Sequence, residues 1–396
     1  MKKSMIVAAM LAMVATGANA KSATDSATIA KNKPVFTVVK QNPITSIKDQ
    51  NRSGTCWAYS TLSYFESEIL KHTGKTYDLS EMFVANKTYM DRATMAVRMH
   101  GDVSFSQGGS AYDVLYALQH YGIVPEGAMP APGTLTGDSL ANFGEFFDVM
   151  TPYVEAVAKS NAKKISSAWK SGLQGIIDSY IGKTPEKFTY QGKQYTPQSF
   201  CQSLGLNLDD YVTITSYTHH PMWSKFAVEV QDNWRWPLSY NVPMDDLCKI
   251  IDNAINNGYT IAWGGDVTED GFTRKGLGIA YDVKKVRSMA GTDADHWFKL
   301  SKDEKKEKFD SLGVNAPEVV PTQAMRQEAF DNWETTDDHG MHIYGIAKDQ
   351  NGKEYYMVKN SWGEYGDYKG TWYMTKAFVA YKTMDFMVNK NAIPKD

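Results

Sequence analysis

Apolar residues recur along residues 56–74 with the spacing of an α-helix that packs on one side. Ala58, Leu62, Phe65 and Ile69 follow one another at steps of four, three and four, which places all four on one helix face. Gly74 is a natural C-terminal cap, because glycine adopts the left-handed backbone conformation without a steric penalty. The pattern therefore predicts a helix that is buried on one side and ends near Gly74.

Cys56 lies at the start of this predicted helix. Ser53, Gly54 and Thr55 precede it, and a hydroxyl there can cap the first turn, so Cys56 belongs to that turn whichever residue is the cap. Backbone N–H groups and the positive end of the helix dipole lower the pKa of a thiol at such a position. A lone cysteine is more often a small buried apolar residue, but the polar, glycine-containing loop before it and the nearby Gln50 favour a nucleophile.

Other apolar patterns predict the remaining elements. Short alternating or continuous apolar runs predict strands at residues 35–39, 188–196 (two pieces joined by a Gln191-Gly192 turn), 260–266, 354–359 and 383–388. Apolar residues at helical spacing predict helices at residues 79–99, 114–121, 165–181 and 244–256. The charged run 301–308 is most simply the solvated face of a helix.

The first 20 residues are typical of a signal peptide. Lys2 and Lys3 precede an apolar run over residues 5–15, and Ala18-Asn19-Ala20 supplies a small-residue cleavage site. The apolar run is too short to span a bilayer comfortably. We therefore expect an exported protein, periplasmic or secreted, that begins at Lys21 and is not inserted in a membrane after cleavage.

Composition narrows the class of protein. A chain of 396 residues, 42% of them hydrophobic, can bury a substantial core. Its net charge of −3 gives no electrostatic reason to expect a nucleic acid partner. The three cysteines, Cys56, Cys201 and Cys248, are too few for a disulfide scaffold, and a single Cys201–Cys248 bridge stays open.

Three histidines in irregular segments do not indicate a metal site. His219, His220 and His296 lack the Cys, His or carboxylate spacing of metal-binding motifs. We therefore expect no bound metal ion.

Two other histidines compete for the role of acid–base partner to a cysteine nucleophile. Such a nucleophile needs an imidazole to take its proton and a third group to orient that ring. His339 and His342 are three positions apart, so in a strand they point to opposite faces and only one can face a cleft.

Four motifs taken together resemble the papain-like cysteine peptidases, and within them the bleomycin hydrolase and aminopeptidase C branch. The motifs are Gln50 six residues before Cys56-Trp57-Ala58, the loop Gly108-Gly109, the sequence Asp338-His339 with Gly345 six residues on, and Asn360-Ser361-Trp362-Gly363. Ser53 stands where many papain relatives have a disulfide-bonded cysteine, a departure that fits this branch.

The resemblance implies roles for these residues. Cys56 would be the nucleophile, His339 its proton acceptor, Asn360 the group that orients His339, and Gln50 an oxyanion donor. Gly108 and Gly109 would bind the substrate backbone, and Trp362 and Asp338 would also contact the substrate. Trp362 would shield the bond between His339 and Asn360 from water. His342 would pack on the other face of its strand.

The resemblance also implies a fold and an assembly. The expected class is α+β, with a helical lobe over residues 35–153 that carries the nucleophile helix, a mainly helical insertion over 154–257, and an antiparallel β-barrel lobe over 258–396. Residues 21–34 would be a flexible leader. Peptides would be the substrates, no cofactor would be required, and a homohexamer is expected.

The resemblance favours an aminopeptidase, because in this branch a C-terminal arm meets the free ammonium of the substrate. The tail of this chain, residues 389–396, is shorter than usual in the branch. Either it still brings the Asp396 carboxylate to the cleft, or the groove is open and the enzyme is an endopeptidase. An inactive peptide-binding scaffold is the alternative from another class.

Overall fold

The structure, a computed structural model, describes residues 32–133, 140–288 and 301–395. The predicted signal peptide, most of the predicted leader, His296 and Asp396 lie outside these residues. Among the described residues, no helix combines the length and apolarity needed to cross a membrane.

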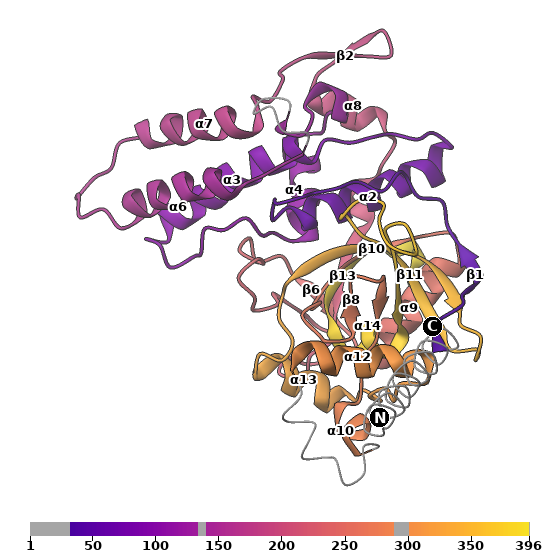
Figure 1. The fold of residues 1–396 in the computed structure, drawn as a ribbon. Helices are drawn as coiled ribbons and strands as arrows, with labels where there is room; N and C mark the ends of the chain where they lie inside the picture. The colour runs from indigo at the N-terminus through magenta and orange to yellow at the C-terminus, as the bar shows by residue number, and fades with distance from the viewer. Residues whose placement is uncertain (1–31, 134–139, 289–300, 396) are drawn as a thin grey trace, which may run out of the picture.

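A layer of helices lies over a large sheet, with further helices on the far side of the sheet (Figure 1). The helices are α2 (Cys56–Thr73), α3 (Glu81–Arg98), α4 (Ala111–His120), α6 (Gly144–Ala158), α7 (Ala168–Ile181), α8 (Pro197–Ser203), α9 (Met244–Asn256), α10 (Val283–Ser288), α12 (Lys302–Leu312), α13 (Gln323–Asp331) and α14 (Lys376–Lys382). The strands are β1 (Thr37–Gln41), β2 (Phe188–Tyr190), β3 (Lys193–Tyr195), β4 (Tyr211–Thr215), β5 (Lys225–Phe226), β6 (Ser239–Asn241), β7 (Ile261–Gly265), β8 (Phe272–Thr273), β9 (Leu277–Gly278), β10 (His339–Lys348), β11 (Glu354–Lys359), β12 (Thr371–Thr375) and β13 (Thr383–Asn389).

Strand β10 is the centre of the sheet. It pairs antiparallel with β11 along one edge, and with β7 and then β1 along the other. The strand order is β5-β6-β4-β13-β7-β10-β11-β12-β9-β8, in which only β4–β6 and β12–β9 are parallel pairs. This largely antiparallel sheet under a separate helical layer confirms the predicted α+β class.

Helix α2 begins at Cys56 and ends at Thr73, as predicted. Gly74 caps it at φ +68°, and its N–H donates to the Leu70 carbonyl. The predicted hydroxyl cap at the other end is wrong. Thr55 makes no side-chain cap bond, because its hydroxyl lies 2.5 Å from Ser53 Oγ inside the loop.

Segment 154–257, which the sequence indicates as one mainly helical insertion, is shared between the two layers. The side chains of α7 and α8 join the core of the helical layer, and the β2–β3 hairpin packs beside them. The strands β4, β5 and β6 extend the sheet, and α9 packs into the core enclosed by the sheet. The segment therefore reaches across both halves of the molecule.

The C-terminal tail packs against α9. A short 3-10 turn over Lys390–Ala392 follows β13, and Asn253 on α9 donates to the Ala392 carbonyl at 2.7 Å. Ala392 is fully buried in the core enclosed by the sheet. The described part of the tail is thus fixed on the side of α9.

His342 is a buried neutral side chain on the face of β10 that packs on α2. It is fully buried, and Ser63 Oγ lies 2.9 Å from its Nδ1. Burial, followed by the nearby Lys359 charge, holds the pKa of His342 well below its ordinary value. The native state therefore keeps this imidazole uncharged.

We expect His342→Phe to reduce the loss in the free energy of unfolding that occurs as the pH falls from 7 to 5. The folded pKa of His342 lies below the unfolded value near 6.5, so the unfolded state binds the proton first as pH falls, and the native state loses stability. Between pH 7 and pH 5 this amounts to about 2 kcal/mol. Urea unfolding at both pH values should show a correspondingly smaller loss in the variant.

The same replacement at His120, an exposed histidine at the end of α4, is the control. It should leave the loss between pH 7 and pH 5 unchanged. An equal loss in His342→Phe and the unchanged protein would contradict the buried, neutral state of His342.

Candidate active site

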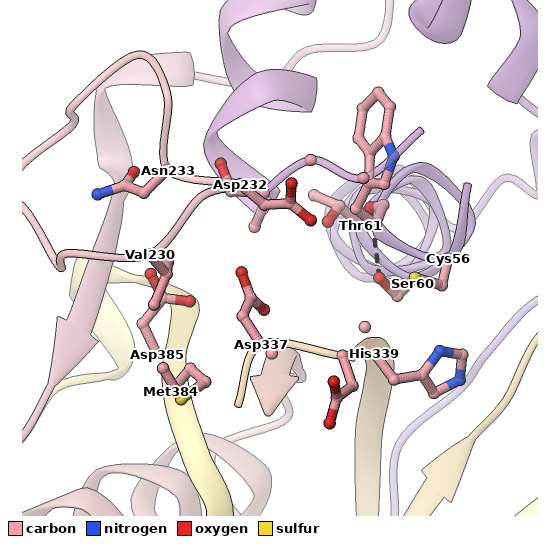
Figure 2. Close-up of a pocket in the computed structure, with 18 of the residues that line it drawn as sticks. Cys56, Ser60, Thr61, Val230, Asp232, Asn233, Asp337, His339, Met384 and Asp385 are labelled. Carbon is pink, nitrogen blue, oxygen red and sulfur yellow. Dashed lines mark hydrogen bonds between the residues drawn. The ribbon is translucent and has the colours of Figure 1, made fainter. Parts of the chain in front are cut away.

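Cys56 and His339 line one cavity of about 250 Å³ between α2 and the start of β10 (Figure 2). Its walls are formed by the first turns of α2, the loop before α4, the loop after β5, the end of β7 and the starts of β10 and β13. The predicted residues Gly108, Gly109 and Asp338 line the same cavity.

The imidazole of His339 is held from behind by Asn360 and Trp362. His339 Nε2 lies 2.9 Å from Asn360 Oδ1, and the His339 and Trp362 rings are 4.9 Å apart. Asn360 Oδ1 can only accept, so Nε2 carries the proton and Nδ1 keeps its lone pair. The ring can then accept a proton at Nδ1 while Asn360 holds its orientation.

Strand pairing brings these two residues together. His339 begins β10 and Asn360 follows β11, and the antiparallel register pairs His342 with Lys359. On the other side, the Asn360 N–H extends the pairing of β11 with β12 by donating to the Gly370 carbonyl. Two residues that are 21 positions apart thus become neighbours through one hairpin.

The environment of Cys56 differs from the sequence-based expectation. Burial raises the pKa of the Cys56 thiol to about 11, although a hydrogen bond from the Gly340 backbone lowers it. Burial likewise lowers the pKa of His339 to about 4, against the opposing effect of Asn360. Burial therefore outweighs the helix N-terminus, and the thiol and the imidazole are both neutral near pH 7 in this structure.

Gln50 ties the cysteine loop to the turn that follows Asn360. Its Nε2 donates to the Ser53 carbonyl at 2.7 Å, and its Oε1 accepts from Ser361 Oγ at 2.6 Å. A side-chain amide has two protons on nitrogen, so the bond to Ser53 leaves one of them for another acceptor. Gln50 is buried and packed beside the loop that positions Cys56.

Gly108 and Gly109 leave no room for side chains. A Cβ on Gly109 would lie 2.8 Å from the Trp57 ring, and one on Gly108 would lie 1.8 Å from Asp232 Oδ2. Both glycines are therefore required by close packing. Asp338 lies exposed at the rim, where its carboxylate accepts from Thr336 Oγ1.

A loop over residues 228–236, which no pattern in the sequence indicates as part of the site, closes one side of the cavity. Val228, Val230, Asp232 and Asn233 line the cavity from this loop. The loop follows β5 in the sheet, but its side chains are bound to the helical layer. It thus bridges the two layers beside Cys56.

Arg92 on α3 fixes this loop from inside the helical layer. Its side chain is fully buried, and its five N–H donors make five hydrogen bonds. Three of the acceptors are the Gly108 carbonyl at 2.6 Å, Asp232 Oδ1 at 3.0 Å and the Gln231 carbonyl at 3.3 Å. One guanidinium therefore joins the Gly108 loop to the 228–236 loop.

Arg235 makes a second attachment. It donates to Asp113 on α4 at 2.6 Å and to Asp91 on α3 at 2.7 Å, and it stacks on the Tyr116 ring. Its side chain is largely shielded from water, and so is that of Asp113. The 228–236 loop is thus held at two points on the helical layer.

Three carboxylates that the sequence did not single out face the cavity. Asp232, Asp337 and Asp385 line it on the side that the 228–236 loop closes (Figure 2). Burial, together with the charges of Asp232 and Asp385, raises the pKa of Asp337 well above its usual range, and burial raises that of Asp385 to about 6. The only sequence signal was the position of Asp337 two residues before His339.

Comparisons with known proteins agree with this geometry. A family model described as the Peptidase C1-like family matches residues 2–316. Aminopeptidase G of Lactobacillus delbrueckii subsp. lactis is 23% identical over 391 residues, which cover 89% of this chain and 83% of that protein. Human bleomycin hydrolase is 21% identical over 418 residues, which cover 93% of this chain and 86% of that protein.

A solved structure shares the fold. PepW from Lactobacillus rhamnosis HN001 superposes with a TM-score of 0.67 at 19% identity, covering 93% of this chain and 85% of that one. The family match extends over most of the chain and includes Cys56. The chain therefore belongs to the Peptidase C1-like family and is a papain-like cysteine peptidase.

Proposed function

We propose that this protein is a cysteine aminopeptidase that removes residues from the free N-terminus of peptides. The observation that carries the proposal is the cavity beside Cys56, which is closed by the 228–236 loop and surrounded there by Asp232, Asp337 and Asp385. The relatives named aminopeptidase G and aminopeptidase C support it.

Cys56 Sγ is the proposed nucleophile. As Sγ attacks the carbonyl carbon of the scissile peptide bond, the thiol proton passes to His339 Nδ1. His339 then gives this proton to the leaving amine, and water hydrolyses the thioester to release the acid and restore the thiol. Asn360 keeps the imidazole oriented throughout, since its bond is to Nε2.

The oxyanion of the tetrahedral intermediate needs donors near Cys56. The proposed donors are the backbone N–H of Cys56 and the second Nε2 proton of Gln50. The bonds of Gln50 to Ser53 and Ser361 fix the amide in place, which is what a preorganised donor requires.

The 228–236 loop limits how far a substrate extends. A peptide that follows the Gly108-Gly109 backbone meets the Asp232 carboxylate, which lies against Gly108. Arg92 and Arg235 hold the loop there through buried charge-assisted bonds. The position of the loop therefore argues against an endopeptidase, for which an open groove is expected.

The carboxylates supply the chemistry for a free N-terminus. Asp337 is surrounded by the like charges of Asp232, Asp385 and Asp338, with Arg92 as the opposing charge. An α-ammonium in this part of the cavity gains two or more charged acceptors and reduces the repulsion among them. In the branch this chain resembles, a C-terminal carboxylate meets the ammonium, whereas here the described tail packs on α9.

We expect Cys56→Ala to abolish peptide cleavage without loss of the fold, because the small side chain removes only the nucleophile. Turnover of a fluorogenic aminoacyl substrate and the thermal melting curve are the measurements. Cys248→Ala is the matched control and should keep its activity, since Cys248 lies on α9 outside the cavity. Turnover by folded Cys56→Ala would overturn the assignment of the nucleophile.

We expect a peptide with a free N-terminus to be cleaved from that end and its acetylated form to resist. Asp337→Asn should lower kcat/KM for the free peptide about 10- to 100-fold, because a hydrogen bond to a charged group contributes about 1.5–3 kcal/mol. The measurement is product analysis by mass spectrometry with initial rates for both peptides.

Asp102→Asn, an exposed position in the loop after α3, controls for the loss of one negative charge and should leave kcat/KM unchanged. Internal cleavage of both peptides at equal rates would reject the aminopeptidase in favour of an endopeptidase.

We also propose that the protein is exported and that its first 20 residues are a signal peptide. The basic start, the short apolar run and Ala18-Asn19-Ala20 support this. Expression of the full chain in a bacterial host should give a periplasmic product whose N-terminal residue, by mass spectrometry, is Lys21. A cytoplasmic product that keeps Met1 would contradict it. The homohexamer stays a prediction.

A further inference from the structure

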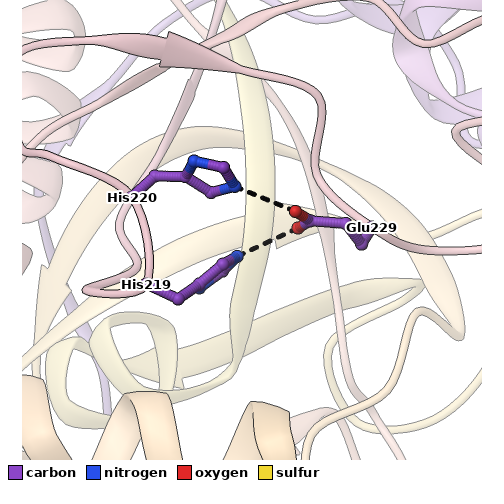
Figure 3. A group of neighbouring side chains, drawn as sticks. All are labelled: His219, His220 and Glu229. Carbon is purple, nitrogen blue, oxygen red and sulfur yellow. Dashed lines mark hydrogen bonds and ion pairs between the residues drawn. The ribbon is translucent and has the colours of Figure 1, made fainter.

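The side chains of two adjacent histidines, His219 and His220, converge on Glu229 of the 228–236 loop (Figure 3). His219 Nε2 lies 3.0 Å from Glu229 Oε2, and His220 Nε2 lies 2.9 Å from Glu229 Oε1. One atom from each of the three residues lies within 4.8 Å of the others. We propose that His219, His220 and Glu229 bind a divalent transition-metal ion such as Zn²⁺.

The donor set and its dimensions suit this ion. Zn²⁺ is commonly held by two histidine nitrogens and a carboxylate, with bonds of about 2.0–2.2 Å and a water in the open position. Ligand atoms on a tetrahedron of that size lie about 3.3 Å apart. The nitrogen–oxygen separations are only a few tenths of an ångström shorter, so rotations of exposed side chains are enough to admit the ion.

Aromatic packing fixes both imidazole planes in advance. The His220 ring stacks on Phe226 with centroids 4.1 Å apart and planes 21° apart. The His219 ring lies parallel to Phe330 on α13, with planes 16° apart. Rings held in this way lose little conformational freedom when they bind a metal ion.

Gln327 supports His219 from behind. A ligating histidine almost always has its other ring nitrogen bonded to a further group, which sets the tautomer. Ligation through Nε2 requires the proton on His219 Nδ1, which can then donate to Gln327 Oε1 at 3.4 Å. Gln327 is itself held, since Thr218 Oγ1 donates to its Oε1 at 3.1 Å and its Nε2 donates to Asp331 at 2.9 Å.

A simple ion pair accounts less well for the arrangement. The side chains are 31%, 37% and 55% exposed for His219, His220 and Glu229, and an exposed ion pair contributes at most about 1 kcal/mol. An ion pair with Glu229 requires only one imidazole. Here two imidazoles present the same ring atom, Nε2, to the two oxygens of one carboxylate. Three potential metal ligands therefore lie close together, as in a site that holds a cation.

The site connects to the active-site cavity through Glu229 itself. Glu229 lies between Val228 and Val230, which both line the cavity, and Asp232 follows three residues later. The loop is internally braced, since Asn233 Nδ2 donates to the Val228 carbonyl at 2.9 Å. A bound ion would therefore anchor the loop to the turn at His219 and His220 and restrict its movement.

The test uses tag-free, full-length protein carrying Cys56→Ala, because the active-site thiol is itself a zinc ligand. After treatment with a chelator, calorimetric titration with Zn²⁺ should show one ion per chain with a dissociation constant in the micromolar range or below. Zn²⁺ should raise the melting temperature, and Mg²⁺ should not, since a ligand that binds only the native state stabilises it.

Two further variants separate this site from others. His219→Ala and His220→Ala should each weaken Zn²⁺ binding at least tenfold, whereas His120→Ala on α4 should not. Co²⁺ should give visible absorption bands of a four-coordinate site that disappear in His220→Ala. Zinc affinity and Co²⁺ bands that survive in folded His219→Ala and His220→Ala, or only weak binding of several ions, would overturn the site. These readouts do not depend on peptide cleavage.

Discussion

The close approach of β10 to the start of α2 is the constraint on which the candidate site depends. A Cβ on Gly340 would lie 2.6 Å from Ser60 Oγ and 3.3 Å from the Cys56 carbonyl oxygen, so only glycine permits this contact. His339 immediately precedes Gly340, and Cys56 begins α2. The separation of thiol and imidazole is therefore set by backbone packing, which tolerates little change in a dense interior.

The buried Arg92 places the 228–236 loop with comparable firmness. Removing a guanidinium from water costs several kcal/mol, and this cost is offset only because all five of its donors are bonded. An apolar residue would fill the space without that cost but would not join the Gly108 loop to Asp232. The charged guanidinium of Arg92 thus fixes the position of the 228–236 loop, and this loop closes one side of the cavity.

Much of the fold, and several of the residues that line the candidate site, could be predicted from the sequence. The predicted segments 244–256, 354–359 and 383–388 coincide with α9, β11 and β13 to within one residue, because their apolar spacing is regular. Helix α6 has an equally apolar face, but a proline inside it conceals the pattern.

The acidic side of the cavity could not be predicted, for a topological reason. Asp232 lies in the loop after β5, Asp337 lies just before β10, and Asp385 lies in β13. No periodic pattern in the sequence links these three positions. The grouping of His219, His220 and Glu229 could not be predicted for a similar reason, because the fold of the chain after the two histidines brings Glu229 back to them. The pKa of Cys56 differs from the prediction, because a helix N-terminus can be recognised from sequence, whereas burial depends on the whole fold.

In the proposed function, the carboxylates connect substrate recognition to the reactivity of Cys56. After burial, the charges of Asp337 and Asp232 are among the effects that raise the pKa of the Cys56 thiol. A cation placed among these carboxylates offsets their field, so the thiolate becomes easier to form when an ammonium occupies the cavity. A blocked N-terminus lacks that charge and leaves the field in place. Selection for a free N-terminus would then act on the nucleophile as well as on binding, and an empty cavity would keep the thiol protonated.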